Sequence, residues 1–454
     1  MKTWKKVALT SVTMMAAATL VACGSSSSKG ESKKVTLTYA NWNLGTKAQN
    51  GVERQLIAAW NKANPDVQVK IDEKLSGSTT YTDTLNTEAS AGKLPDVFMS
   101  ASVADNTTSG WAADLTKIEK ADKDFKALPE VVQESVILGG KNVAVPFGES
   151  EMGFFVNDDL LNKLNLTVPD YNTSVDDFVK TVKAATNLSQ KYVGVSEAPS
   201  FTDWLPAQLN QDLGWFTYND GKVNLTAPEM TQAMSIASDL GKNGYSFAQL
   251  TAEQQKALSG GTDANAAFKK GNVAFLYNGT YAAADLQSGA NFNYSFMGLP
   301  GGREDMELDY TIVAKTSKHK QDAYDFAKYM AYGESGYKER LALTKKSGTT
   351  PAYLPLTTNK KLVSEYWKLI AVPGMQDVAN NTKNAMVDPI KTVPGYINAR
   401  WNATTGLKVA GKDNATIGDI INASGLGQVN WSDYAQQIQT LAQKQLDDAA
   451  AKLK

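Results

Sequence analysis

Cysteine and histidine are almost absent from this chain of 454 residues. Cys23 is the only cysteine, so no disulfide can form within the chain and the fold has to be stabilised by packing. His319 is the only histidine, which leaves little for a histidine-based metal site or a serine–histidine catalytic pair. Phosphate-loop, HExxH and GxSxG motifs are missing as well. We therefore expect no metal, no cofactor and no catalytic residue.

The chain also lacks an excess of charge and a long apolar run in its main part. Its 46 basic and 47 acidic residues give a net charge of -1, which argues against the basic surface of a nucleic-acid-binding protein. Beyond residue 22, no stretch approaches the ~20 apolar residues of a membrane-spanning helix. The remaining chain of about 430 residues is too long for one hydrophobic core, so two domains are expected.

The first residues have the pattern of a secretion signal. Three lysines within the first six residues precede an uncharged stretch from Val7 to Val21, and Leu20-Val21-Ala22-Cys23 follows. This run resembles the lipobox of bacterial lipoproteins, in which the cysteine is lipidated and becomes the first residue of the mature protein. We expect a signal peptide at 1–22, a flexible serine-rich tether at 23–34, and a lipid anchor on Cys23. The alternative is an ordinary buried cysteine.

Strand and helix patterns alternate along the rest of the chain. Residues 35–39 and 67–71 alternate between apolar and polar side chains, and the segment between them carries apolar residues at helical spacing up to Pro65. This predicts a β-α-β unit with parallel strands. Further strands are expected near 94–99, 143–146, 153–156 and 273–277, with helices at 82–91, 176–188, 228–241, 321–332 and 432–453. The pattern predicts an α/β fold.

Several sequence blocks, taken in order, resemble one family. They are Tyr39-Ala40-Asn41-Trp42, Leu94-Pro95-Asp96-Val97, Gly110 to Thr116, Val145-Pro146-Phe147 through Leu161, Phe268 to Phe275 with Asn278-Gly279-Thr280-Tyr281, Gly298 to Gly302, and Ser347 to Pro351. Together they resemble the extracellular solute-binding proteins of ABC importers, in the large group that serves sugars and oligosaccharides.

The resemblance implies two α/β lobes that close around a ligand at a hinge. It places lobe 1 at 35–148 plus 285–336 and lobe 2 at 149–284 plus 337–454. It further implies a monomer that takes a saccharide ligand, acts with membrane permease subunits and catalyses no reaction. The lipobox would hold this protein on the outer face of the cell membrane, and the composition favours a Gram-positive surface over a periplasm.

A sugar ring presents an apolar face and a rim of hydroxyls, so its site needs flat aromatic rings and convergent polar groups. Trp42 lies just after a predicted strand, where ligands of open α/β sheets gather. Trp204 follows polar residues in an expected loop, whereas Trp60 and Trp367 are expected in the core. The full set of candidate ligand contacts is Asn41, Trp42, Asn43, Glu149, Glu151, Trp204, Trp215, Asn278, Tyr281, Asp309, Arg400 and Trp401.

Two other functions stay open at this point. The same architecture can bind a non-sugar solute such as a polyamine, a phosphate ester or a peptide. The chain could also be a surface glycoside hydrolase with Glu149 and Glu151 as its acid and base, because two residues that are two apart on a strand share a face.

Overall fold

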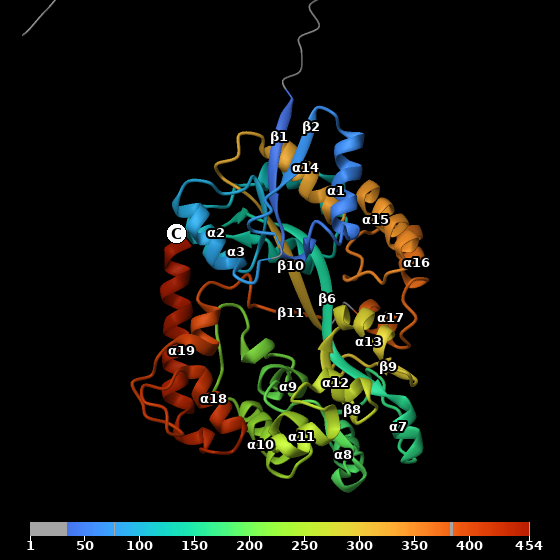
Figure 1. Ribbon diagram of the computed structural model, residues 1–454. Helices are drawn as coiled ribbons and strands as arrows, with labels where there is room; N and C mark the ends of the chain where they lie inside the picture. The colour runs from blue at the N-terminus through green and yellow to red at the C-terminus, as the bar shows by residue number, and fades with distance from the viewer. Residues whose placement is uncertain (1–33, 77, 382–384, 454) are drawn as a thin grey trace, which may run out of the picture.

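The computed structural model describes residues 34–76, 78–381 and 385–453, which form two lobes that lie one above the other in Figure 1. The predicted signal peptide 1–22, Cys23 and nearly all of the predicted tether 23–34 lie outside the described residues. The α/β class and the two-lobe architecture that the sequence predicts are confirmed.

One mixed sheet runs through both lobes, in the order β2-β1-β3-β10-β6-β8-β7, with β11 paired to β10 and β9 paired to β6. The predicted β-α-β unit is present, because β1 and β2 pair in parallel on either side of α1. β10 is antiparallel to both β3 and β6. The strands of this sheet are β1 Val35–Ala40, β2 Val67–Ile71, β3 Val97–Ser100, β6 Val145–Asn157, β7 Val193–Val195, β8 Val273–Gly279, β9 Tyr294–Phe296, β10 Asp305–Val313 and β11 Met386–Val387.

The first lobe is built around one hydrophobic core, which takes its residues from 37–147, from 306–332 and from Leu356. Apolar side chains alternate along β1, so that Leu37 and Tyr39 are fully buried. The helices of this region are α1 Val52–Ala63, α2 Tyr81–Ser90, α3 Val103–Thr108, α4 Thr116–Ala121, α5 Lys123–Lys126, α6 Glu130–Ser135, α14 Lys320–Met330 and α15 Glu334–Ser347, and β4 Ile137–Leu138 pairs with β5 Lys141–Asn142.

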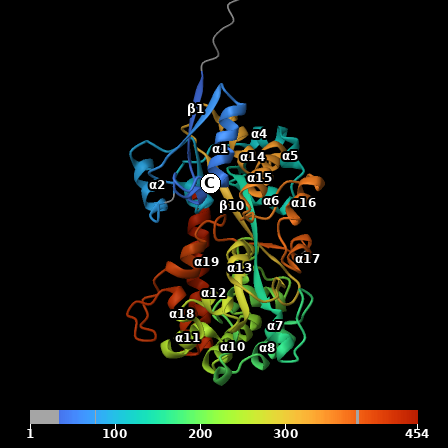
Figure 2. The same cartoon turned by 45° about the vertical axis from the view of Figure 1, so that its right-hand side comes forward.

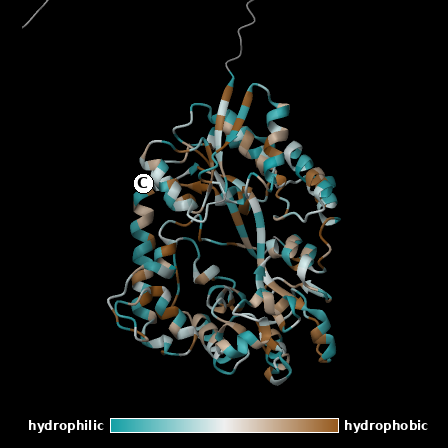
Figure 3. Ribbon diagram, in the orientation of Figure 1, coloured by the Kyte–Doolittle hydropathy of each residue, from teal (hydrophilic) through white to brown (hydrophobic). Residues whose placement is uncertain are grey.

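The second lobe contains one hydrophobic core and most of another, which also takes Tyr337 and Leu341 from α15 of the first lobe. Figure 3 shows apolar residues along the strands, and helices that mix apolar and polar residues around them. The helices of this region are α7 Asp158–Lys163, α8 Val175–Ala184, α9 Phe201–Leu209, α10 Pro228–Lys242, α11 Ala252–Ser259, α12 Ala264–Lys269, α13 Ala283–Gly289, α16 Lys360–Trp367, α17 Met375–Asn380, α18 Ile417–Gly425 and α19 Ala435–Ala450.

Two long strands connect the lobes. The sequence predicts two short strands near 143–146 and 153–156, but β6 is one strand that continues through the polar residues between them. Its partner β10 pairs with β6 at its first-lobe end and at its second-lobe end. In the second lobe, Gly153 of β6 lets the segment after β9 pass close by, because a Cβ there would lie 2.6 Å from the Cα of Gly298.

The predicted lobe boundaries can be compared with the residues of the cores, and the boundaries themselves stay predictions. Leu286 and Phe296, which were placed in lobe 1, pack in a core of the second lobe, and the chain returns to the first core at β10. At the other end, α19 packs in the second lobe while Leu453, in the short helix η9 Ala451–Leu453 that follows it, packs against the first core. Figure 2 shows α19 extending upward toward the first lobe.

Candidate functional site

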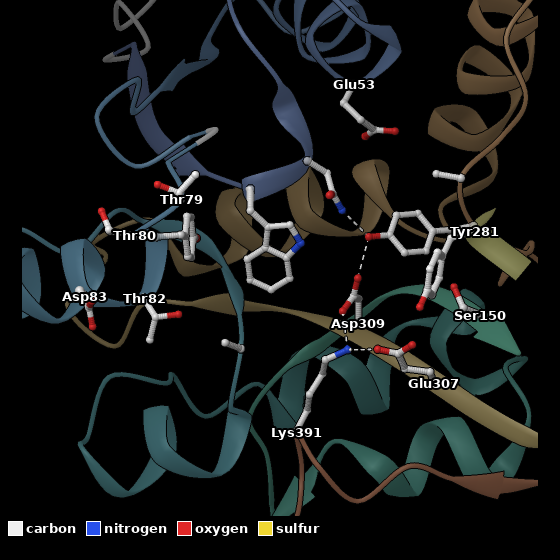
Figure 4. A pocket seen from close by; sticks show the side chains of 16 residues that line it. Glu53, Thr79, Thr80, Thr82, Asp83, Ser150, Tyr281, Glu307, Asp309 and Lys391 are labelled. Atoms are coloured by element: carbon white, nitrogen blue, oxygen red, sulfur yellow. Dashed lines mark hydrogen bonds and ion pairs between the residues drawn. The ribbon is translucent and has the colours of Figure 1, made fainter. Parts of the chain in front are cut away.

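A cavity of about 780 Å³ lies between the lobes. The first lobe, the connecting strands and the second lobe all contribute to its walls, as Figure 4 shows from close by. Its lining residues are Trp42, Asn43, Glu53, Thr79, Thr80, Tyr81, Thr82, Asp83, Ala101, Ser150, Tyr281, Glu307, Asp309, Ala352, Tyr353 and Lys391.

Trp42 reaches the cavity because β1 ends in a short capped turn. β1 stops at Ala40, and the side chain of Asn41 then accepts a hydrogen bond from the backbone N–H of Asn43, at 2.7 Å. This caps the short helix η1 Trp42–Leu44. The indole packs edge-on against Tyr81 at the start of α2, with ring centroids 5.2 Å apart. The first lobe thus supplies an aromatic wall.

Tyr281 faces this wall from the second lobe. It lies in η5 Thr280–Ala282, directly after β8, and 45% of its surface is exposed. A tyrosine ring that is this exposed on the cavity wall is available for stacking against a ligand.

The floor of the cavity is a hydrogen-bonded row of charged side chains. Glu307 and Asp309 alternate along β10, and Lys391 Nζ donates to Glu307 Oε1 at 2.9 Å and to Asp309 Oδ1 at 2.8 Å (Figure 4). Burial opposes the charge on Lys391, but Asp309 and Glu307 outweigh it and raise the pKa of the ammonium group. Tyr353 Oη donates to Asp309 Oδ2 at 2.6 Å and accepts from Asn43 Nδ2.

The cavity carries more negative than positive charge. Four carboxylates line it, namely those of Glu53, Asp83, Glu307 and Asp309, against the single ammonium of Lys391. Glu53 is paired with Arg340, whose Nη2 lies 2.8 Å from Glu53 Oε2. Lys391 is already paired with Glu307 and Asp309, so an anionic ligand would find no free basic partner among the described lining residues.

The structure brings four of the sequence-predicted site residues together on the cavity wall: Trp42, Asn43, Tyr281 and Asp309. That these residues touch a ligand remains a prediction. Asp309 lies in strand β10. Asn41 is adjacent but fully buried, and its amide donates to Tyr39 Oη at 2.8 Å, so it shapes the turn without lining the cavity.

Glu149 and Glu151 point away from the cavity. Ser150 between them lines it, and neighbouring residues of a strand face opposite sides of the sheet. Both glutamates are buried, with 6% and 1% of their surface exposed. Burial raises the pKa of Glu149 to about 7, while burial and then the charge of Glu149 raise the pKa of Glu151. The expected placement of this pair at the cleft, as hydroxyl acceptors or as a glycosidase acid and base, is therefore corrected.

Trp204 and Trp215 lie in the core of the second lobe. Trp204 belongs to helix α9 and not to the expected loop, and it is fully buried against Phe201 and Phe154. Trp215 is 6% exposed in the same core. Both indoles are therefore part of the second-lobe core, and neither ring lines the cavity.

The remaining predicted residues also make contacts within the second lobe. Arg400 is buried, and its Nε lies 2.6 Å from Asp203 Oδ1, so it forms an ion pair instead of reaching the cavity as a hydroxyl clamp. Trp401 packs partly buried against the second-lobe core. The side-chain amide of Asn278 donates to Asn265 Oδ1 at 2.9 Å.

Sequence reasoning missed most of the polar lining. Glu307 could have been found, because it alternates with Asp309 in a strand-like run. Tyr353 comes two residues after the Ser347 to Pro351 block. No local pattern marks Lys391, which reaches the cavity from the segment after β11.

Residues 46–331 match the family model described as bacterial extracellular solute-binding protein. The chain belongs to this family. A search of the curated proteins returned no match for this solute-binding protein. Within the described residues, no helix is long and apolar enough to cross a membrane, and no group of three His, Cys, Asp or Glu side chains could hold a metal ion.

Solved structures of similar fold cover nearly the whole of this solute-binding protein. An ABC substrate-binding protein from Listeria monocytogenes in complex with cycloalternan has a TM-score of 0.68 at 19% identity, over 90% of this chain and 98% of the other. The cyclic alpha-maltosyl-1,6-maltose binding protein from Arthrobacter globiformis has a TM-score of 0.67 at 16% identity, over 91% and 100%. A sugar transporter from Rhizobium etli in an open conformation has a TM-score of 0.65 at 19% identity, over 90% and 99%. At these identities, the likeness supports the fold.

Proposed function

We propose that this protein is the substrate-binding component of an ABC importer, and that it captures a neutral sugar or short oligosaccharide in the cavity between its lobes. It is tethered to the outer face of the cell membrane through Cys23, acts as a monomer and hands its ligand to the membrane permease. The permease recognises the protein by the closure of its lobes around the ligand.

The chemistry of the cavity wall carries this proposal. Trp42 and Tyr281 offer flat rings from opposite lobes, and such rings pack against the C–H face of a pyranose. Threonine hydroxyls at the start of α2, the Asn43 amide and the carboxylates of β10 converge around them. Carboxylates and amides suit sugar hydroxyls, because each hydroxyl both donates and accepts a hydrogen bond. A volume of about 780 Å³ suits a ligand of more than one ring.

The relatives of known fold support the same class of ligand. Three of them carry names that refer to cycloalternan, to cyclic alpha-maltosyl-1,6-maltose and to sugar transport. Their low identity leaves the particular saccharide of this chain open, so the proposal specifies a class of ligand only.

A polyamine is the second candidate, since an acidic cavity with aromatic walls also suits a chain of ammonium groups. A phosphate ester is disfavoured because the carboxylates outnumber the lysine on the cavity wall. Hydrolysis with Glu149 and Glu151 as acid and base is disfavoured because both face away from the cavity.

Isothermal titration calorimetry over a panel of neutral saccharides and spermidine tests the proposal. We expect micromolar or tighter binding of at least one saccharide and a loss of at least tenfold in affinity on Trp42→Ala. Trp367→Ala is the matched control, because Trp367 lies on α16 and does not line the cavity. Binding of spermidine alone, or equal losses in both variants, would refute the saccharide proposal.

A further inference from the structure

The main cavity adjoins a second chamber of about 230 Å³. The two share four lining residues, namely Asn43, Glu53, Ala352 and Tyr353. The second chamber extends from these residues between α1, α15 and the segment that joins α15 to α16. The side chains of Asn43 and Tyr353 therefore stand on the boundary between the two spaces.

Tyr353 is held at this boundary by two hydrogen bonds and by the packing of its ring against the first core. Its hydroxyl accepts from Asn43 Nδ2 and donates to Asp309 Oδ2 at 2.6 Å. Its ring lies against the backbone of Gly148, where a Cβ would approach the ring to 2.5 Å, and edge-on to Phe147 with centroids 5.6 Å apart. Tyr353 is only half-buried, and it belongs to a segment without regular secondary structure.

The two hydrogen bonds of Tyr353 are ones that a sugar hydroxyl can replace. A phenol and a sugar hydroxyl each donate one hydrogen bond and accept others. A ligand hydroxyl between Asn43 and Asp309 would accept from the amide and donate to the carboxylate, as the phenol does now. After the exchange, Asn43 and Asp309 each still have a hydrogen-bond partner. Displacing the Tyr353 ring therefore leaves neither of them unpaired, and its free-energy cost is small.

The second chamber has the chemistry of a sugar subsite. Phe147 and Tyr337 supply aromatic surface, and Thr344 and Thr350 supply hydroxyls. The ion pair of Arg340 and Glu53 lies on its wall. A chamber of about 230 Å³ is smaller than the usual site for a ligand of several rings, so it has room for one ring and not for a chain.

We propose that Tyr353 is a gate that a ligand hydroxyl displaces, and that the chamber behind it takes one further sugar unit of a longer or branched oligosaccharide. This rests on the proposed function, since the same ligand occupies both spaces. A disaccharide fills the main cavity alone and leaves the gate closed, whereas a longer ligand opens it. Tyr353 thus determines the chain length that the protein prefers.

Calorimetry with a size series of malto- and xylo-oligosaccharides tests the gate. Thr349→Trp places an indole in the second chamber from an exposed position that does not line the main cavity. We expect it to weaken the longest bound saccharide at least tenfold and to leave the shortest one within twofold, while Thr349→Ser changes neither. Equal effects on both lengths, or none on either, would overturn the gate and leave the saccharide proposal standing.

Tyr353→Phe provides a second, independent variant. It keeps the ring and removes the hydroxyl, so no hydrogen bond of Tyr353 has to be replaced when the ring moves. We therefore expect unchanged or tighter binding of the longest saccharide. If this variant instead weakens every saccharide equally, the hydroxyl contacts ligand directly and the gate is refuted. Binding of no saccharide to the unaltered protein would refute the proposed function, and the gate with it.

Discussion

The buried carboxyl pair of β6 should make this protein less stable as the pH rises. Burial raises the pKa of Glu149 from its ordinary 4.5 to about 7, and a hydrogen bond with Glu151 works against that rise. The other titratable groups that face Glu149 are Tyr337 and Tyr366, whose pKa values burial also raises, so they stay neutral. No basic side chain is paired with Glu149 among the described residues.

The sign of the effect follows from proton linkage. Between the unfolded pKa near 4.5 and the folded pKa near 7, the folded protein holds a proton that the unfolded chain has lost. The stability linked to Glu149 is therefore fully present below pH 4.5 and is lost as the pH rises through 7. Each tenfold change in the dissociation constant is worth about 1.4 kcal/mol, so the loss is roughly 3 kcal/mol.

Glu149→Gln removes the titrating proton and keeps the shape of the side chain. We expect the free energy of unfolding of the variant, relative to the unaltered protein, to be higher at pH 8 than at pH 4.5 by about 2–3 kcal/mol. Urea unfolding followed by circular dichroism at the two pH values measures this difference. Glu134→Gln is the control, because Glu134 is exposed on α6. A difference that is the same at both pH values within ~0.5 kcal/mol would refute the buried, protonated state of Glu149.

Three further predictions concern the core, the cavity charge and the anchor. Arg400→Ala breaks the buried pair with Asp203 and should lower the free energy of unfolding by about 3 kcal/mol. Ligand affinity, measured by calorimetry, should stay within twofold. Unchanged stability with a large loss of affinity would instead indicate that Arg400 contacts the ligand. A uronic-acid oligosaccharide should bind at least tenfold more weakly than its neutral counterpart of equal length, because the lining carboxylates repel it, and equal affinities would contradict the charge argument. Cys23→Ser should abolish incorporation of labelled fatty acid and release the protein from the cell surface, and retained label would exclude Cys23 as the acylated residue.

Short-range patterns in the sequence predicted the elements whose faces differ sharply in polarity. β1 and α1 follow from the alternation of residues 35–39 and from the helical spacing up to Pro65, because one side of each is buried against the first core. β6 was predicted as two pieces because its middle residues are polar. That stretch connects the lobes. One face of the strand there carries the buried carboxyl groups, and the other face places Ser150 on the cavity wall.

The site was predictable only where a local rule applied. Trp42 and Asn43 follow from the position of ligands at strand ends, and the structure places both on the cavity wall. Trp204 was misplaced because polar neighbours and Pro206 suggested a loop, whereas the proline lies inside helix α9 and the indole fills the core. Lys391 and Tyr353 reach the cavity through the topology, which no local pattern encodes.

A crystal structure with a bound saccharide tests the central claim most directly. The best ligand from the calorimetric panel would be co-crystallised at a concentration well above its dissociation constant. The account predicts a sugar ring in the cavity between the lobes, stacked on Trp42 or Tyr281, with hydroxyls bonded to Asn43 and to the carboxylates of β10. A saccharide bound elsewhere, with this cavity holding only solvent, would contradict it.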